Sequence, residues 1–236
     1  MGLSLALVRA EPRARAVPAL FQRTHGEGAR RFLNLAVAAL GIVLTLPLML
    51  LIAVLIKLTS RGPVLYTQPR VGLDRRILTG IGGNTRRHFD YGGRLFTIYK
   101  FRTMYVERTD RAAERWAAAD DPRVTPVGRI LRRLRLDELP QLFNVLRGDM
   151  NVVGPRPEQP TIFISLRAQI EGFQRRQRVR PGITGWAQVN RGYDRSLDDV
   201  RAKLAFDLEY IRRQSALEDL KVMVRTVPVM LFGRGS

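Results

Sequence analysis

The sequence predicts a mostly helical α+β fold that joins one membrane-inserted helix to a domain of soluble character. Residues 32–56 form a run of 25 residues without a formal charge. Two short segments, 63–68 and 95–99, have the β-branched and aromatic composition of strands, and they predict a small β-hairpin. After residue 125, apolar residues recur at the 3.6-residue spacing of amphipathic helices.

The 236-residue chain is strongly basic: it has 40 Lys and Arg residues and only 21 Asp and Glu residues, which gives a net charge of +19. Such an excess indicates an anionic partner, either nucleic acid, phospholipid headgroups or a phosphorylated substrate. The chain has no cysteine and 2 histidines, which excludes a disulfide scaffold, a thiol nucleophile and a histidine-rich metal site. A divalent cation would therefore need carboxylate ligands, which favours Mg²⁺, with Mn²⁺ as the alternative.

The uncharged run is long enough to enter a membrane. As a helix it measures about 37 Å, which exceeds the hydrocarbon core of about 30 Å. A signal peptide fits badly, because the run begins late in the chain and lacks a small-residue cleavage site. We therefore predict three parts: a basic N-terminal arm (1–30), a membrane helix (31–58) and a cytoplasmic domain with interfacial helices (59–236).

The flanks of the run and its central proline indicate how the helix enters. Both flanks are rich in arginine and lysine, which marks the cytoplasmic side of a membrane. Pro47 lies mid-run, where it removes a backbone hydrogen bond and bends a helix. A re-entrant helix that is broken at Pro47 and returns to the same face satisfies both observations. A kinked spanning helix is the alternative, since proline is common in membrane helices.

The remaining segments predict loops and helices in a regular order. Residues 74–93 read as a long loop, and 106–119 as a helix. Thr125 and Pro126 suit the N-cap and first position of the next helix. A second helix should follow, with Leu139, Leu142, Phe143 and Leu146 inward and Gly148 at its end. Helices are also expected at about 161–177 and 196–214, while 217–232 could lie in the core or on a membrane surface.

The adjacent carboxylates of Asp137 and Glu138 are the best candidates for chemistry. Pro140 fits only the first turn of a helix, so Asp137 should lie at or near its N-cap. In a purely structural interpretation Asp137 is a cap and Glu138 a favourable first-turn acid. In a functional interpretation the helix N-terminus keeps Asp137 ionised and able to attack, and Glu138 holds a Mg²⁺ ion that neutralises a diphosphate.

Four motifs together closely resemble the bacterial sugar transferase family, the monotopic polyprenyl-phosphate phosphoglycosyl transferases. They are Lys100–Met104, Leu136–Met150, Gly154–Pro157 and Arg180–Asn190, and the resemblance extends from about residue 31 to residue 231. It implies transfer of a sugar-1-phosphate from a nucleotide-diphosphate sugar to undecaprenyl phosphate, with release of the nucleoside monophosphate. It also implies a re-entrant helix that is broken at a proline.

The resemblance assigns roles to particular residues. Asp137 matches the family's nucleophile, and Glu138 matches its Mg²⁺-binding partner. The positions expected to bind substrate are Lys100, Arg102, Arg132, Arg156, Arg180 and Asp207. Of these, Arg156 matches the arginine of the Pro-Arg-Pro motif that is associated with the nucleotide. One departure is Leu46, because members often have serine before the helix-breaking proline.

The expected partners are undecaprenyl phosphate, a nucleotide-diphosphate sugar, anionic phospholipid headgroups and downstream glycosyltransferases. UDP is the expected nucleotide, because members of the resembled family usually use UDP-sugars. The reaction would be the first step of exopolysaccharide, O-antigen or glycoconjugate assembly. The expected location is the cytoplasmic face of the bacterial inner membrane, with the helix monotopic. The sugar, the pathway and the oligomeric state stay open.

Two other classes of function remain as alternatives. A non-catalytic scaffold could use its arginine-rich face on anionic lipid, and a basic protein could bind nucleic acid with a steep dependence on salt. The apolar segment and the lack of any nucleic-acid-binding motif argue against the second alternative, so no nucleic-acid partner is expected.

Overall fold

The computed structural model describes residues 26–74, 91–106, 121–192 and 196–232. The helices are α1 (Glu27–Thr59), α3 (Pro126–Arg133), α4 (Gln141–Arg147), α5 (Pro160–Gln169), α6 (Trp186–Asn190), α7 (Leu197–Arg213) and α8 (Ala216–Phe232), with 3-10 turns η1 (Leu136–Glu138) and η2 (Phe173–Arg178). The strands are β1 (Leu65–Val71), β2 (Leu95–Phe101), β3 (Asn151–Val153) and β4 (Gly182–Thr184). The protein is thus mostly helical, as predicted. The predicted helix at 106–119 and the loop at 74–93 lie almost entirely outside the described residues.

The strands form two small sheets rather than one. The predicted hairpin is confirmed, because β1 and β2 pair antiparallel from Leu65 opposite Phe101 to Val71 opposite Leu95. The second sheet is the parallel pair β3 and β4. The segment 180–190, rich in glycine and with Pro181, is not a loop: it forms β4 and α6. Glycine allows this close pairing, because a Cβ on Gly182 would lie 2.1 Å from the backbone nitrogen of Gly154.

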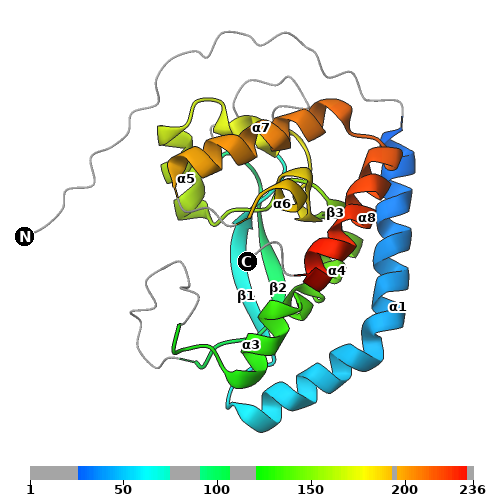
Figure 1. Cartoon of the computed structure of the whole chain (residues 1–236), viewed down its shortest axis with the longest axis vertical. Coiled ribbons are helices and arrows are strands. Elements are labelled where there is room, and N and C mark those ends of the chain that lie inside the picture. Colours follow the sequence, from blue (N-terminus) through cyan, green and yellow to red (C-terminus); the bar gives the residue numbers. More distant parts are fainter. Residues whose placement is uncertain (1–25, 75–90, 107–120, 193–195, 233–236) are drawn as a thin grey trace, which may run out of the picture.

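Helix α1 is a single helix of 33 residues, about 50 Å long, that bends between its blue and cyan parts (Figure 1). It begins at Glu27, before the predicted boundary at residue 31. Pro47 lies inside it, and a proline there cannot donate to the carbonyl of Val43, which accounts for a bend. By length and composition α1 could cross a membrane, and only 17% of its most apolar window is buried in the protein.

The caps and the ends of the short helices are as predicted, but the buried face of α4 is only partly as predicted. Thr125 caps α3 by accepting a hydrogen bond from the backbone nitrogen of Gly128 (2.9 Å), and Gly148 ends α4 with a φ of 87°. Leu142 is buried as predicted, whereas Phe143 and Leu146, also predicted to face inward, are exposed. The other buried residues of α4 are Gln141, Asn144 and Val145. The Asn144 side chain donates to the Thr97 carbonyl of β2 (2.7 Å) and accepts from the Tyr99 backbone nitrogen (3.1 Å).

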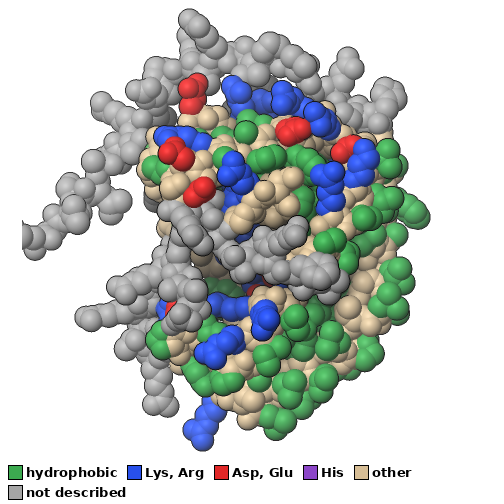
Figure 2. All heavy atoms as spheres, viewed as in Figure 1, with side chains coloured by type: hydrophobic (Ala, Val, Ile, Leu, Met, Phe, Trp, Pro, Cys, Tyr) green, Lys and Arg blue, Asp and Glu red, His purple; other side chains and the backbone are tan. Residues whose placement is uncertain are grey.

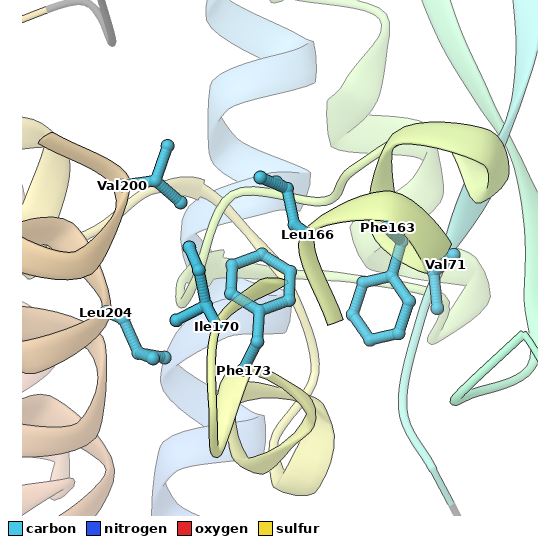
Figure 3. Close-up of a cluster of buried hydrophobic side chains, with 7 residues drawn as sticks. All are labelled: Val71, Phe163, Leu166, Ile170, Phe173, Val200 and Leu204. Carbon is cyan, nitrogen blue, oxygen red and sulfur yellow. The ribbon is translucent and has the colours of Figure 1, made fainter. Parts of the chain in front are cut away.

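The helix predicted at 161–177 is divided in the structure. Helix α5 ends at Gln169, and Gly172 adopts a φ of 75° before η2 begins. The turn folds Phe173 back onto Phe163, with ring centroids 5.4 Å apart, inside a buried cluster that also receives Val200 and Leu204 from α7 (Figure 3). The prediction for α7 is confirmed, and Ser196 forms a capping box with Asp199 at its start.

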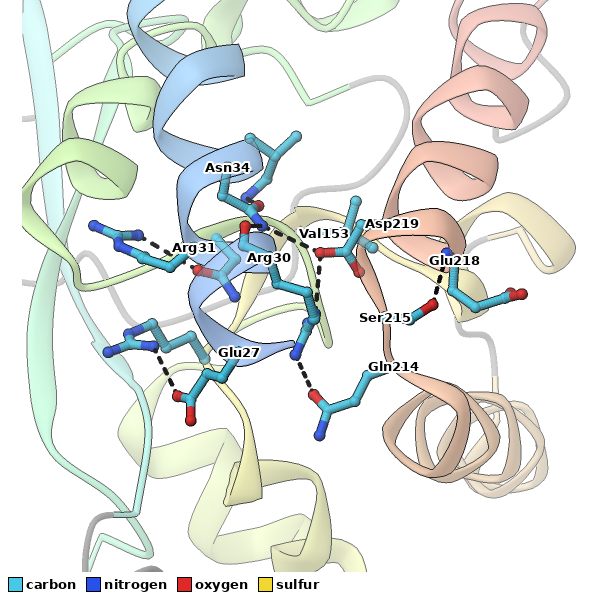
Figure 4. A network of polar contacts seen from close by, with 12 residues as sticks. Glu27, Arg30, Arg31, Asn34, Val153, Gln214, Ser215, Glu218 and Asp219 are labelled. Carbon is cyan, nitrogen blue, oxygen red and sulfur yellow. Dashed lines mark hydrogen bonds and ion pairs between the residues drawn. The ribbon is translucent and has the colours of Figure 1, made fainter. Parts of the chain in front are cut away.

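A buried polar network fastens the first turns of α1 to α7 and α8 (Figure 4). The guanidinium of Arg30 donates to Asp219 (3.3 Å) and to the hydroxyl of Tyr210 (2.8 Å). Asn34 donates to the same Asp219 carboxylate (3.1 Å) and accepts from the backbone nitrogen of Val152 in β3 (2.6 Å). The start of the apolar helix therefore has a fixed position on the domain.

Candidate active site

Asp137 and Glu138 lie in η1, a single 3-10 turn between α3 and α4, and both are buried. Arg135, at the start of the turn, has the left-handed backbone conformation (φ 57°) that reverses the chain after α3. The prediction that Asp137 lies at or near the N-cap of a helix containing Pro140 was wrong. Pro140 is itself the residue before α4 begins at Gln141, so residues 136–138 form a separate turn.

Two cations converge on the Glu138 carboxylate. The Lys100 ammonium from β2 lies 2.7 Å from Glu138 Oε1, and the Arg156 Nη2 atom lies 3.1 Å from the same oxygen. Arg156 belongs to the loop between β3 and α5, so three separate parts of the chain meet at this carboxylate. Lys100 Nζ is also 3.8 Å from Asp137 Oδ2. The structure thus brings together the predicted residues Lys100, Glu138, Asp137 and Arg156.

The surroundings move the pKa values of the two carboxyls in opposite directions. Burial raises the pKa of Asp137, and the positive charge of Lys100 only partly offsets this. Burial also acts to raise the pKa of Glu138, but the charges of Lys100 and Arg156 outweigh it and hold that pKa well below its usual range. The expectation that a helix dipole lowers the pKa of Asp137 was wrong, because desolvation dominates. Paired acids whose pKa values are pushed apart are typical of catalytic sites.

Arg132 lies on the edge of this site. Its Nε atom donates to Thr103 Oγ1 (3.0 Å), and its charge opposes part of the rise that burial causes in the pKa of Asp137. Arg102 is placed differently: its guanidinium donates to the carbonyls of Ser60 and Arg61, each at 2.8 Å. It therefore fastens the end of α1 to the end of β2.

Arg180 also holds backbone rather than the carboxylate pair. Its Nε atom donates to the carbonyl of Gly148 (3.1 Å), just after α4, and its Nη1 atom lies 3.8 Å from Glu27 Oε1. The side chain therefore links the end of α4 to the start of α1. Neither Arg102 nor Arg180 has a described contact with Asp137 or Glu138.

Asp207 reaches the site through one intermediate residue, Arg176. The Arg176 Nη2 atom lies 2.9 Å from Asp207 Oδ2 and also donates to the carbonyl of Arg156 (2.9 Å), while its Nη1 atom pairs with Glu158 (3.2 Å). Burial raises the pKa of Asp207 to about 6, against the charge of Arg176. Sequence reasoning missed Arg176, because an arginine in a helix-like stretch gives no sign that it is buried.

The carboxylates at this site suit a metal ion that takes some of its ligands from the protein and the others from a substrate. Within residues 26–74, 91–106, 121–192 and 196–232, no group of three or more His, Cys, Asp or Glu side chains could hold a metal. Mg²⁺ commonly takes only one or two carboxylates and completes its shell with water and substrate phosphates. The adjacent carboxylates of Asp137 and Glu138 fit that pattern.

The surface around the site combines positive charge with apolar area. Figure 2 shows Lys and Arg side chains gathered beside a hollow near α3, and hydrophobic side chains along the edge that α1 forms in Figure 1. The exposed apolar side chains of α1 include Leu40, Val43, Leu44, Leu50, Leu51 and Val54. A continuous apolar patch of this kind marks a membrane or partner surface.

A family model described as "Bacterial sugar transferase" matches residues 25–233. The chain is 42% identical, over 88% of its length, to the undecaprenyl-phosphate glucose phosphotransferase of Komagataeibacter xylinus, and it covers 36% of that protein. It is 43% identical over 86% of its length to the UDP-glucose:undecaprenyl-phosphate glucose-1-phosphate transferase of Caulobacter vibrioides, of which it covers 69%. It is 34% identical over 91% of its length to the exopolysaccharide production protein ExoY of Sinorhizobium fredii, of which it covers 90%. The chain thus spans little more than a third of the first of these relatives and almost the whole of the last.

Proposed function

Because the chain belongs to the bacterial sugar transferase family, we propose that it transfers a sugar-1-phosphate from a UDP-sugar to undecaprenyl phosphate and releases UMP. Two of the relatives carry names for this reaction with glucose, and a third is named for exopolysaccharide production. The observation that carries the proposal is the buried pair Asp137 and Glu138, which Lys100 and Arg156 join to two other parts of the chain. The product would enter the assembly of a polysaccharide, where downstream glycosyltransferases extend it.

Electrostatics explains why such a reaction needs this site. The donor diphosphate and the lipid phosphate are both anions, so bringing them together in a buried site is unfavourable unless cations are fixed there. Lys100, Arg156 and Arg132 supply fixed positive charge. Glu138 holds Lys100 and Arg156 in place, because its carboxylate is ion-paired with both. Mg²⁺, held by Glu138 together with substrate phosphates, would neutralise further charge on the diphosphate when it is bound.

A nucleophilic aspartate divides the transfer into two displacements. In the first, a carboxylate oxygen of Asp137 forms a bond to the phosphorus that bears the sugar, and the bond from that phosphorus to the bridging oxygen breaks, so UMP leaves with its electron pair. In the second, a phosphate oxygen of the lipid attacks the same phosphorus, and the Asp137 carboxylate leaves. The two anionic substrates need not be bound together. Lys100, 3.8 Å from Asp137, favours the ionised carboxylate that the first step requires.

The re-entrant placement of α1 also belongs to this proposal. The first turns of α1 are fastened to α8 through Arg30 and Asn34, and its last residues are fastened to β2 through Arg102. Since one domain holds both ends of the helix, both ends lie on the same side of a membrane. The bend near the middle and the basic flanks support the same arrangement, with the domain on the cytoplasmic face of the inner membrane and its basic residues near anionic headgroups.

The decisive experiment looks for a sugar phosphate that is covalently bound to Asp137. Without lipid acceptor, the purified protein given its correct UDP-sugar should release up to one equivalent of UMP, and its mass should rise by one sugar phosphate on the peptide containing Asp137. Asp137→Asn should abolish both signals and leave the fold intact, because asparagine has nearly the same shape.

The matched control is Asp198→Asn, on the exposed start of α7, which should keep both signals. If turnover required both substrates at once and no adduct formed, transfer would be direct, and Asp137 would have another role. If no donor in a panel of nucleotide sugars gave UMP or GMP, and Asp137→Asn changed nothing measurable, the non-catalytic scaffold would be the better description.

A further inference from the structure

An apolar pocket lies between α1 and the β-hairpin, outside the carboxylate pair. Its volume is about 470 Å³, and its wall on one side consists of Leu46, Met49, Leu50 and Ala53 from α1. The opposite wall comes from the hairpin and from the start of α4, and every lining residue is apolar or aromatic. This volume lies within the range of sites that bind small molecules.

The pocket is close to the candidate active site along the chain. Tyr99 and Phe101 both line it, and they are the two neighbours of Lys100 on β2. Successive side chains of a strand point to opposite faces, so the pocket residues occupy one face of this strand while Lys100 reaches Glu138 from the other. Pro140, two residues after Glu138, also lines the pocket. Apolar space therefore begins within one or two residues of Lys100 and Glu138.

A cation lies at the edge of this apolar space. The Arg147 guanidinium lies over the Tyr99 ring, 5.7 Å from its centroid, and donates a hydrogen bond to the Tyr99 hydroxyl. The Arg147 side chain is 59% exposed, so an incoming ligand can reach it. A pocket with apolar walls and a cationic edge is complementary to a molecule with an apolar chain and an anionic head.

We propose that this pocket binds the isoprene units next to the phosphate of the polyprenyl phosphate acceptor, with Arg147 and Lys100 on the side of the phosphate. This inference rests on the proposed function, because it takes the acceptor to be a polyprenyl phosphate. In such a lipid the hydrocarbon begins directly at the phosphate ester, whereas in a phospholipid a polar glycerol ester region separates the phosphate from the acyl chains. The apolar lining begins directly beside Arg147 and Lys100, which fits the first kind of lipid.

A labelling experiment on the unaltered protein tests where the chain of the acceptor lies. A polyprenyl phosphate with a photoreactive diazirine on its first isoprene unit is irradiated with the protein in lipid nanodiscs, and the labelled peptides are identified by mass spectrometry. Labels are expected in the segments 46–53 or 140–143. Undecaprenyl phosphate should compete for labelling, and the same amount of added phosphatidylglycerol should not. Labelling confined to other segments, or equal competition by phosphatidylglycerol, would overturn the inference.

A pair of matched variants tests the consequence for turnover. Ala53→Phe fills the pocket, and Ala39→Phe makes the same change at an exposed position of the same helix, outside the pocket. The KM for undecaprenyl phosphate should rise about tenfold or more in Ala53→Phe, since excluding even one isoprene unit removes the burial of several carbon atoms. Ala39→Phe should leave the KM at the wild-type value. Nucleoside monophosphate release without acceptor measures whether each variant is correctly folded.

A second variant keeps the test decisive if Ala53→Phe does not fold. Phe143→Ala removes a half-exposed wall of the pocket, and it should raise the KM for the acceptor in the same direction. An unchanged KM in every folded pocket variant would contradict the inference. Failure of the proposed function has a different signature: the wild-type protein would release no nucleoside monophosphate from any donor, while the labelling pattern would still report what the pocket binds.

Discussion

At the scale of residues, Asp137 and Glu138 are neighbours with different electrostatic surroundings. Glu138 is held ionised by two cations that contact it directly, whereas Asp137 is buried with its nearest described cation, Lys100, at 3.8 Å. A carboxylate that is tightly ion-paired is a poor nucleophile but a good anchor. The division of roles in the proposed mechanism, with Asp137 attacking and Glu138 organising the cations, follows from this difference.

The first residue-scale prediction concerns Glu138→Gln, which keeps the size of the side chain and removes its charge. Activity should fall by orders of magnitude, because a hard cation requires an anionic ligand and because Lys100 and Arg156 lose their common partner. The measurement is the initial rate as a function of Mg²⁺ concentration, where the variant should need more metal and recover only partly. Glu218→Gln, on α8, is the matched control. An unchanged Mg²⁺ requirement would assign the metal to other acids, with Asp149 or Asp207 next to be tested.

The second residue-scale prediction concerns the dependence of stability on pH at Asp207. Its pKa is about 6 in the folded protein against an ordinary value of 3.8, with burial as the main cause and Arg176, Glu158 and Lys203 as the nearby charges. A raised pKa of an acid contributes stability that is complete below pH ~4 and is lost as the pH rises through about 6. The loss amounts to about 3 kcal/mol of unfolding free energy.

Asp207→Asn should remove this part of the pH dependence, because asparagine stays neutral at every pH, so the variant should lose less stability than the wild type as the pH rises. Denaturant unfolding of the protein in detergent, repeated between pH 4 and pH 7, measures this effect. As the pH rises over this range, the unfolding free energy of the wild type should fall relative to that of the variant. The slope of this fall should correspond to about one proton. Asp198→Asn, on the exposed part of the same helix, should give a curve parallel to that of the wild type. Parallel curves for Asp207→Asn would contradict the prediction.

At the scale of elements, α1 is the part whose geometry matters most for function. It is apolar over most of its length, it bends in the middle, and contacts to one domain hold both of its ends. A straight helix of this length would place its ends about 50 Å apart, farther than a hydrocarbon core is thick. In the re-entrant placement proposed above, this bend lets the apolar middle enter the membrane while both ends stay with the domain.

The element-scale prediction is that both flanks of α1 face the cytoplasm. Arg9→Cys and Arg75→Cys, introduced singly into a chain that has no cysteine, should both resist a membrane-impermeant thiol reagent in intact cells. Both should react after permeabilisation, which is the control for accessibility. Labelling of one position alone in intact cells would establish a true crossing. Pro47→Ala restores a backbone donor to the Val43 carbonyl and favours a straight helix, so it should increase the fraction of chains with one flank outside.

At the scale of the whole molecule, the network in Figure 4 sets the position of α1 relative to the rest of the protein. Asp219 is fully buried and accepts hydrogen bonds from Arg30, Asn34 and the Tyr210 hydroxyl. Burial raises the pKa of Tyr210, so its hydroxyl stays protonated and can donate to Asp219 at 2.6 Å. These contacts join the first turns of the apolar helix to α7 and α8, near the other end of the chain.

The whole-molecule prediction is that Asp219→Asn strongly destabilises the protein. The change leaves the buried Arg30 charge without its carboxylate, which costs about 3–5 kcal/mol of unfolding free energy. Denaturant unfolding in detergent measures this loss. The neighbouring change Glu218→Gln breaks an exposed ion pair with Lys221 and should cost about 1 kcal/mol or less. Equal effects of the two changes would show that the network does not hold α1 in place.

The sequence by itself determined the features that depend on neighbouring residues. The uncharged run predicted α1, Thr125 and Gly148 marked helix ends, and the β-rich segments predicted the hairpin. Local sterics and capping decide these features, so a short window of sequence contains the information. The motifs also singled out Asp137, Glu138, Lys100 and Arg156, which the fold brings together.

The tertiary structure alone decided what is buried and which charges meet. Asn144, rather than Phe143, faces inward because the edge of β2 needs hydrogen-bond partners there. The pKa of Asp137 is raised rather than lowered because its surroundings exclude water. Arg176 becomes part of the site because the packing buries it against the carbonyl of Arg156. Arg102 binds the end of α1 because the packing places it next to the carbonyl of Ser60. Burial and the pairing of distant charges depend on how the elements pack, and no short pattern of residues specifies that packing.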